Sequence, residues 1–147
     1  MKRTLSFIAL AFATLTLAGC GQEPNAAVPA PRKLTAEAVG HYCGMTLTEH
    51  TGPKGQIILA SQSTPVWFSS ARDAFSYTML QEEAKDVRAV YVSDMGKAAS
   101  WDNPGAENWI EARGALFVIE SRRQGGMGAP ETVPFSARAD AERFVAE

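Results

Sequence analysis

The sequence has few of the residues that most often build catalytic and structural metal sites. Its 147 residues include two cysteines and two histidines, and no Cys-x-x-Cys pair occurs. A structural zinc site would show more thiolates or imidazoles at tight spacing, so this kind of site is not expected. Clusters of lysine and arginine are also missing. If a signal segment carries away Lys2 and Arg3, the 14 basic residues fall to 12 against 16 acidic ones, a balance that does not indicate nucleic-acid binding.

Apolar runs that approach membrane length are missing after the start of the chain. At the start, the positive Met1-Lys2-Arg3 precedes an uncharged stretch from Ser6 to Ala18, which is too short to span a bilayer as a helix. This is the pattern of a secretory signal. The stretch ends in Leu17-Ala18-Gly19-Cys20, which resembles a bacterial lipobox. We therefore predict a signal peptide over residues 1–19, cleavage before Cys20 and lipid on its thiol. The alternative is an ordinary signal peptide in which this cysteine is incidental.

A proline-rich tether is predicted to follow the lipidated cysteine, over residues 20–33. It has three prolines between Gly21 and Pro31 and too little apolar surface to fold, so it should stay extended. Residues 34–147 are enough for one domain with a single core. We expect this domain on the periplasmic side of a bacterial membrane. Gly21, rather than an aspartate, follows the cysteine, and by resemblance to enterobacterial sorting rules this favours the outer membrane over the inner one.

The first half of the domain is predicted to combine three strands with one helix. Short apolar or β-branched runs at 56–60, 65–68 and 87–93 indicate the strands. Between the second and third runs, Ser70 and Asp73 have the spacing of a capping box. A helix with one buried face is expected next, because suitable residues recur at helical spacing: Ala71, Ala74, Phe75, Thr78 and Met79.

The second half is predicted to repeat this order of elements. Runs at 115–119 and 131–135 indicate two strands, and Pro134 argues that the later one lies at an edge or ends there. A helical stretch follows from Ser136. A turn at 101–105 separates the halves.

A short internal match supports a duplicated architecture. The junction at 68–72 reads Phe-Ser-Ser-Ala-Arg, and the junction at 135–138 reads Phe-Ser-Ala-Arg. We therefore predict an α+β fold of two strand-strand-helix-strand units with small antiparallel sheets, over about 34–97 and 98–147. The second unit is expected to lack its last strand.

Cys43-Gly44-Met45 is the first candidate for chemistry. Alternate residues of an extended chain project to one side, so thiol and thioether would face one point, and Gly44 keeps the approach open. Soft sulfur ligands suit Cu(I) and disfavour magnesium, calcium or manganese. If lipid occupies Cys20, Cys43 is the only thiol of the mature domain, in an oxidising compartment. The alternative is a small buried cysteine beside a methionine that fills the core.

Met127 is a second sulfur candidate. It lies within Gly125-Gly126-Met127-Gly128, where few neighbours can bury it, so the loop is suited to present its sulfur. The alternative is an ordinary loop with an incidental methionine. Three residues are secondary candidates. Met95 follows a strand and could instead pack on the core, and His41 or His50 could be a third ligand or a base for the thiol.

Four segments of the domain stand out together. They are Tyr42-Cys43-Gly44-Met45 continued to Ile57, Val66-Trp67-Phe68-Ser69-Ser70-Ala71-Arg72 continued to Phe75, Met95-Gly96-Lys97, and Gly126-Met127-Gly128-Ala129-Pro130-Glu131. In this order and behind a lipobox, they resemble the NosL family of accessory lipoproteins in nitrous-oxide reductase maturation, and the resemblance covers the domain almost throughout. The resemblance implies two strand-strand-helix-strand units, related in architecture to organomercurial lyase. The chain departs from the family at its end, where members usually continue into another strand.

The resemblance also implies a function, that of a Cu(I) metallochaperone and not of an enzyme. Copper would pass to a membrane maturation complex, an ABC transporter with a periplasmic partner protein, which assembles the copper centres of nitrous-oxide reductase. The triplet matches the family's metal-binding motif, and Met127 matches its glycine-flanked methionine. The metal ligands implied in this way are Cys43, Met45 and Met127.

Two other functions stay open at the level of the sequence. Cys43 could be an enzyme nucleophile activated by His41 or His50, although no orienting acid or oxyanion loop is evident. The protein could also be an adaptor lipoprotein with an inert, buried Cys43. Alkylation rates against pH, access of thiol reagents and copper titration would separate these functions from a copper chaperone.

Overall fold

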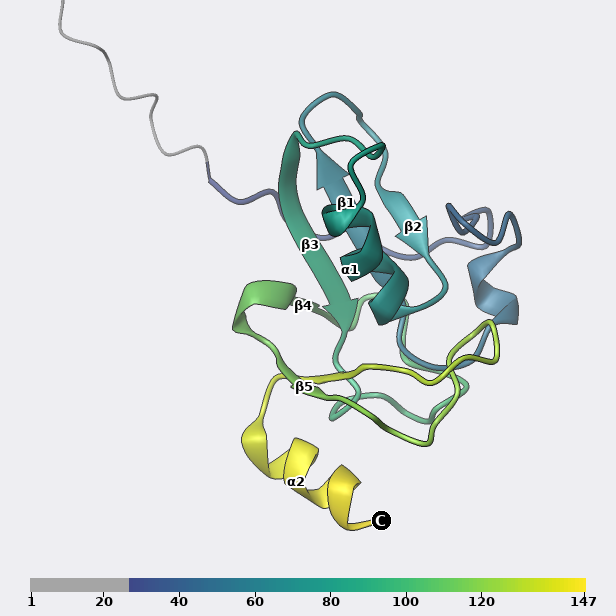
Figure 1. Ribbon diagram of the computed structural model, residues 1–147, viewed down its shortest axis with the longest axis vertical. Coiled ribbons are helices and arrows are strands. Elements are labelled where there is room, and N and C mark those ends of the chain that lie inside the picture. The colour runs from purple at the N-terminus through teal and green to yellow at the C-terminus, as the bar shows by residue number, and fades with distance from the viewer. Residues whose placement is uncertain (1–26) are drawn as a thin grey trace, which may run out of the picture.

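The computed structural model describes residues 27–147 (Figure 1). The predicted signal peptide, the lipidation site Cys20 and the first half of the tether, residues 20–26, lie outside the described residues. Within residues 27–147, no helix has the length and apolar character needed to cross a membrane.

The larger of the two antiparallel sheets has four strands in the order β2-β1-β3-β4. Ile57 of β1 pairs with Val66 of β2 on one side and with Val90 of β3 on the other. Helix α1 covers one face of this sheet (Figure 1) and closes a core of Ile57, Leu59, Val66, Phe68, Ala74 and Tyr77. The strands are β1 (Gly55–Leu59), β2 (Val66–Phe68), β3 (Val87–Ser93) and β4 (Trp109–Glu111), and the helix is α1 (Ala71–Met79).

Helix α1 begins where the capping residues predict it. Ser70 is the N-cap, and its hydroxyl oxygen accepts a hydrogen bond from the Asp73 amide at 3.4 Å. The buried face differs from the predicted one, because Tyr77 packs on the sheet while Met79 is 73% exposed. Phe75 turns toward the second half instead, where its ring meets Phe117 at 5.0 Å between centroids.

The smaller sheet pairs β5 with β6, and α2 packs against it (Figure 1). Their bounds are β5 (Leu116–Val118), β6 (Val133–Phe135) and α2 (Arg138–Ala146), and the short 3-10 helices are η1 (Leu47–Glu49) and η2 (Ala112–Gly114). The prediction of an α+β fold with two small antiparallel sheets and two helices is confirmed. Strand β4 comes from the second half of the sequence but completes the first sheet, so the sheets do not divide the chain as the predicted units do.

Two buried carboxylates tie the halves together at the starts of the helices. Asp94, directly after β3, accepts hydrogen bonds from the amide and hydroxyl of Ser136, just before α2. Glu131, just before β6, accepts from the Ser70 hydroxyl and the Arg72 amide at the start of α1, both at 3.2 Å. Burial by itself would raise the pKa of Asp94, but hydrogen bonds from Ser136 and Lys97 outweigh it and lower that pKa. Each half therefore supplies one carboxylate to the other.

Candidate metal centre

The loop that carries Cys43 is a tight turn beside the edge strand β2. The Gly40 amide donates to the Met45 carbonyl at 2.9 Å, and the Gly44 amide donates to the Gly40 carbonyl at 2.8 Å. Gly44 has φ +65°, a conformation that favours glycine. The expectation of an extended triplet is therefore wrong. Cys43 reaches its neighbours through a turn, and its Sγ lies 3.8 Å from the Met45 carbonyl oxygen.

His50 is the side chain that the structure brings to the thiol. Its Nε2 lies 3.7 Å from Cys43 Sγ, and its Nδ1 lies 2.7 Å from the Gly126 carbonyl oxygen. Because a carbonyl only accepts, the hydrogen of the neutral imidazole belongs on Nδ1. Nε2 then directs its lone pair toward Cys43. A histidine that binds a metal usually donates its other ring hydrogen to a carbonyl or carboxylate in this way.

Gly126 allows the second half of the chain to approach this pair. A Cβ atom at this position would lie 2.7 Å from His50 Cβ and 2.8 Å from the Ser69 carbonyl oxygen. Any larger residue would push the loop away from His50. The glycine before Met127 therefore has a definite structural role, which is to bring the methionine loop next to the thiol–imidazole pair.

Both candidate methionines are open to solvent. Met127 follows Gly126 in a turn closed by the Gly128 amide and the Gly125 carbonyl at 2.9 Å, and it is 52% exposed. Met45 is 42% exposed, while Cys43 is half-buried and His50 is only 8% exposed. The candidate site therefore has a covered imidazole and a partly covered thiol, and an incoming molecule can reach the two methionines on the same loops.

The other two secondary candidates are engaged elsewhere. His41 Nε2 lies 3.2 Å from Glu83 Oε1, and its ring packs edge-on against Phe68 and Tyr77. Met95 lines a cavity of about 220 Å³ under α2, together with Phe135 and Phe144 among others. Neither has a contact with Cys43 among the interactions of the described residues.

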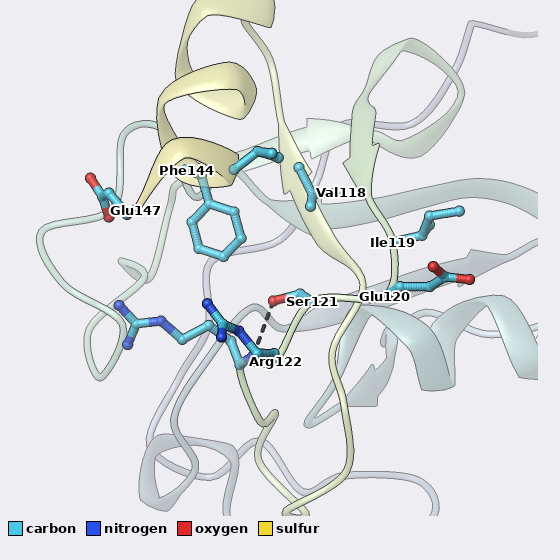
Figure 2. Close-up of a pocket in the computed structure, with 9 residues that line it drawn as sticks. Val118, Ile119, Glu120, Ser121, Arg122, Phe144 and Glu147 are labelled. Carbon is cyan, nitrogen blue, oxygen red and sulfur yellow. Dashed lines mark hydrogen bonds between the residues drawn. The ribbon is translucent and has the colours of Figure 1, made fainter.

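A separate hollow of about 340 Å³ lies between the end of β5 and α2. Figure 2 shows Phe144 of α2 facing this hollow, opposite the chain around Ser121 and Arg122. No cysteine, histidine or methionine is among its lining residues, so it offers no soft ligand. Among the described residues, the free thiol is that of Cys43.

Comparison with known proteins identifies the family. The NosL family model matches residues 31–147. The chain belongs to the NosL family. A curated relative, the copper-binding lipoprotein NosL of Achromobacter cycloclastes, is 45% identical over 146 residues, which cover 99% of this chain and 75% of the relative. The copper-binding lipoprotein NosL of Stutzerimonas stutzeri is 29% identical over 140 residues, which cover 95% of this chain and 70% of the relative.

A solved NosL structure supports the fold described above. The crystal structure of the copper chaperone NosL from Shewanella denitrificans superposes with a TM-score of 0.72 at 35% sequence identity. The match covers 79% of this chain and 85% of the NosL structure. The α+β arrangement is thus a fold found in the NosL family.

The sequence did not separate His50 from His41. Both histidines lie within seven positions of Cys43, so spacing favours neither. What distinguishes His50 is the hydrogen bond from its Nδ1 to the carbonyl oxygen of Gly126, a residue 76 positions away in the sequence. The glycine on each side of Met127 was the available signal, because a residue without Cβ marks a close approach of the backbone to another part of the chain.

Proposed function

We propose that this member of the NosL family is a periplasmic Cu(I) metallochaperone that supplies copper for assembly of the copper centres of nitrous-oxide reductase. The observation that carries the proposal is the 3.7 Å approach of Cys43 Sγ to His50 Nε2, with an exposed methionine on each adjoining loop. Further support comes from the relatives, which are named copper-binding lipoprotein and copper chaperone.

The distance between the two atoms suits two ligands of one small ion. With zinc bond lengths as a guide, about 2.3 Å to sulfur and about 2.0 Å to nitrogen, an angle of about 120° separates the ligand atoms by about 3.7 Å. The Cys43–His50 distance has this value before any rearrangement. We assign the thiolate and His50 Nε2 as two ligands and a thioether, from Met45 or Met127, as the third. Thiolate and thioether favour Cu(I) over harder ions.

The exposed thioethers suit a site that gives its metal away. When Cu(I) binds, the Cys43 thiol loses its proton to solvent and a sulfur–copper bond forms. Met45 and Met127 are about half exposed, so a sulfur or imidazole of a partner can enter while a thioether leaves. A closed four-coordinate site would retain the ion instead.

Attachment to the membrane would place this site near its receiver. We propose that lipid on Cys20 anchors the protein and that the tether over 20–33 gives the domain reach to an ABC-transporter-type maturation complex and its periplasmic protein. The relatives are named lipoproteins, which supports the anchor. Replacing Cys20 by serine should release the protein from membranes and leave Cu(I) affinity unchanged. Loss of copper binding in this variant would contradict our assignment of the two cysteines.

A Cu(I) competition titration tests the metal site. The full chain with Cys20→Ser would be titrated against a chromophoric Cu(I) chelator, alone and with Cys43→Ala or His41→Ala. We expect Cys43→Ala to abolish tight binding and His41→Ala, the matched control, to retain it. Wild-type affinity in the Cys43→Ala variant would refute the proposal.

The same contact also suits a second function, a thiol nucleophile with His50 as its base. The two functions differ in what the apoprotein does. An enzyme would need a Cys43 thiolate that reacts rapidly with iodoacetamide below pH 7 without metal, whereas the chaperone needs only a thiol that ionises when copper binds. Alkylation rates of the apoprotein between pH 5 and pH 9 therefore decide between them.

A further inference from the structure

The loop that carries Met127 is a closed unit with Glu131 at its base. The Glu131 amide donates to the Arg123 carbonyl at 2.9 Å, and the Gly125 amide donates to the Ala129 carbonyl at 2.8 Å. The turn at Gly125–Gly128 forms its tip. Because these bonds join the two arms of the loop, whatever fixes Glu131 also fixes the tip.

The side chain of Glu131 is fixed on the first half of the protein. Its Oε1 accepts hydrogen bonds from the Ser70 hydroxyl and the Arg72 amide at 3.2 Å, and from the Thr132 amide at 2.9 Å. Glu131 is only 2% exposed. Ser70 and Arg72 are at the start of α1, which packs on the larger sheet. The carboxylate thus connects the loop to a helix that contributes Ala74 and Tyr77 to the core of the larger sheet.

The second carboxylate oxygen contacts the loop itself. Glu131 Oε2 is buried and has no hydrogen-bond partner among the described residues. A Cβ atom built on Gly125 would lie 2.2 Å from it, so the oxygen rests against the glycine at the start of the turn. Gly126, the next residue, contacts His50 on the other side of the loop. The turn is held between a carboxylate and the imidazole.

We propose that Glu131 is a positioning residue of the metal centre, which holds the Gly126 carbonyl against His50 Nδ1 and so keeps Nε2 directed at Cys43. It would place Met127 by the same contact. Glu131 touches neither the thiol nor the imidazole and acts through the loop. The inference deepens the proposed copper function and rests on it for the metal-binding consequence alone.

Three substitutions test the contact from both sides. Glu131→Ala removes the acceptor and the packing against Gly125. Glu131→Gln keeps an acceptor oxygen for Ser70, Arg72 and Thr132, so it should restore the wild-type behaviour. Gly125→Ala leaves Glu131 in place but introduces the atom that would collide with Oε2, and it should imitate Glu131→Ala. Asp94→Asn is the matched control, since Asp94 is an equally buried carboxylate that binds the start of the other helix.

Two measurements on the full chain, with Cys20→Ser in every variant, separate positioning from general destabilisation. The first is the imidazole nitrogen NMR spectrum of the apoprotein, which reports which His50 nitrogen carries the hydrogen. The second is Cu(I) affinity by competition. We expect Glu131→Ala and Gly125→Ala to mix the two His50 tautomers and to weaken Cu(I) binding by about 10–100-fold, the usual effect of losing an outer partner of a metal ligand. Asp94→Asn should lower stability and leave both readouts unchanged.

The outcomes are distinct for the two proposals. A single Nδ1–H tautomer and wild-type Cu(I) affinity in Glu131→Ala would overturn the positioning role. So would a Glu131→Gln variant as defective as Glu131→Ala, because the charge rather than the hydrogen-bond geometry would then be responsible. If Cys43→Ala still bound Cu(I) tightly, the copper function would fail, but the tautomer measurement would still decide whether Glu131 orients His50. If the Glu131→Ala variant folds poorly, the Gly125→Ala variant tests the positioning role with the same two measurements.

Discussion

His50 donates its Nδ1 hydrogen to the carbonyl oxygen of Gly126 at 2.7 Å, across 76 positions of the chain. This single bond joins the two halves of the protein at the thiol and selects the imidazole tautomer that can bind a metal. Metal binding by His50 would therefore depend on the carbonyl oxygen of Gly126. This is a backbone atom, so no motif of side chains in the sequence indicates it.

Loss of the His50 imidazole should weaken Cu(I) binding far more than loss of the His41 imidazole. In His50→Ala, Cu(I) would keep the thiolate but lose a ligand and the link to the methionine loop, so we expect affinity to fall by more than about 100-fold, beyond the usual effect of an outer-partner loss. Competition titration measures this fall. Equal and small effects in His50→Ala and His41→Ala would show that His50 is not a ligand.

Replacement of the methionines by leucine should identify the third ligand with little change in packing volume. X-ray absorption of the copper-bound protein would count two sulfur neighbours and one nitrogen in the wild type. We expect either Met45→Leu or Met127→Leu to remove one sulfur, and the double variant to retain thiolate and imidazole only. Two sulfur neighbours in the double variant would contradict the assignment of a thioether.

Gly126→Ala should disturb the site through crowding. The new Cβ would meet His50 Cβ at 2.7 Å and the Ser69 carbonyl oxygen at 2.8 Å. We expect a loss of about 1–3 kcal/mol in the free energy of unfolding, the range for overpacking, together with weaker Cu(I) binding. Urea unfolding measures the first effect. Gly114→Ala is the control, because no atom lies within 4 Å of a Cβ there, and an equal loss in this variant would refute the steric explanation.

Lys54 should make the protein more stable as pH rises from about 8 to about 10. Burial lowers the pKa of Lys54 to about 8, although the charge of Glu131 opposes this shift. In this interval the unfolded chain still binds a proton that the folded protein has released, so the free energy of unfolding increases with pH. Above it, Tyr77 and Tyr91 act in the opposite direction, because burial raises the pKa of each phenol.

Urea midpoints at pH 8, 9 and 10 test this contribution. The wild-type midpoint should rise relative to that of Lys54→Met, which fills similar space without a titrating amine. Parallel curves for the two proteins would mean that the Lys54 amine keeps its ordinary proton affinity in the folded state.

The sequence predicted the local elements well, because their signals are local. The run 87–93 becomes β3 with the same bounds, and the serine before Ala71 caps α1 as its spacing predicts. Strand β4 was missed because a three-residue strand after a turn has too few residues to show an alternating pattern. Its place in the first sheet depends on pairing with β3, which is a long-range contact.

Prediction of the site was limited in the same way. The residues Cys43, Met45 and Met127 were visible as soft sulfur candidates, and their roles as ligands stay predictions. The turn at Gly44 depends on contacts with β2, and the selection of His50 depends on its contact with Gly126. Both contacts are long-range, so the residues next to Gly44 and His50 in the sequence do not indicate them. In the sequence, Glu131 was visible only as part of a motif and of a predicted strand. A carboxylate that acts on His50 through a loop has no characteristic spacing from that histidine in the sequence.

The thiol and His50 come from the first half of the chain, and the Met127 loop comes from the second. A metal ion held by both would act as a removable cross-link, which restricts the unfolded chain much as a disulfide does between distant residues. Transfer of the metal ion to a partner would then lower the free energy of unfolding of the protein. The emptied protein should unfold more readily and be cleaved sooner by proteases than the metal-bound one, so that turnover would fall first on molecules that have already delivered their metal.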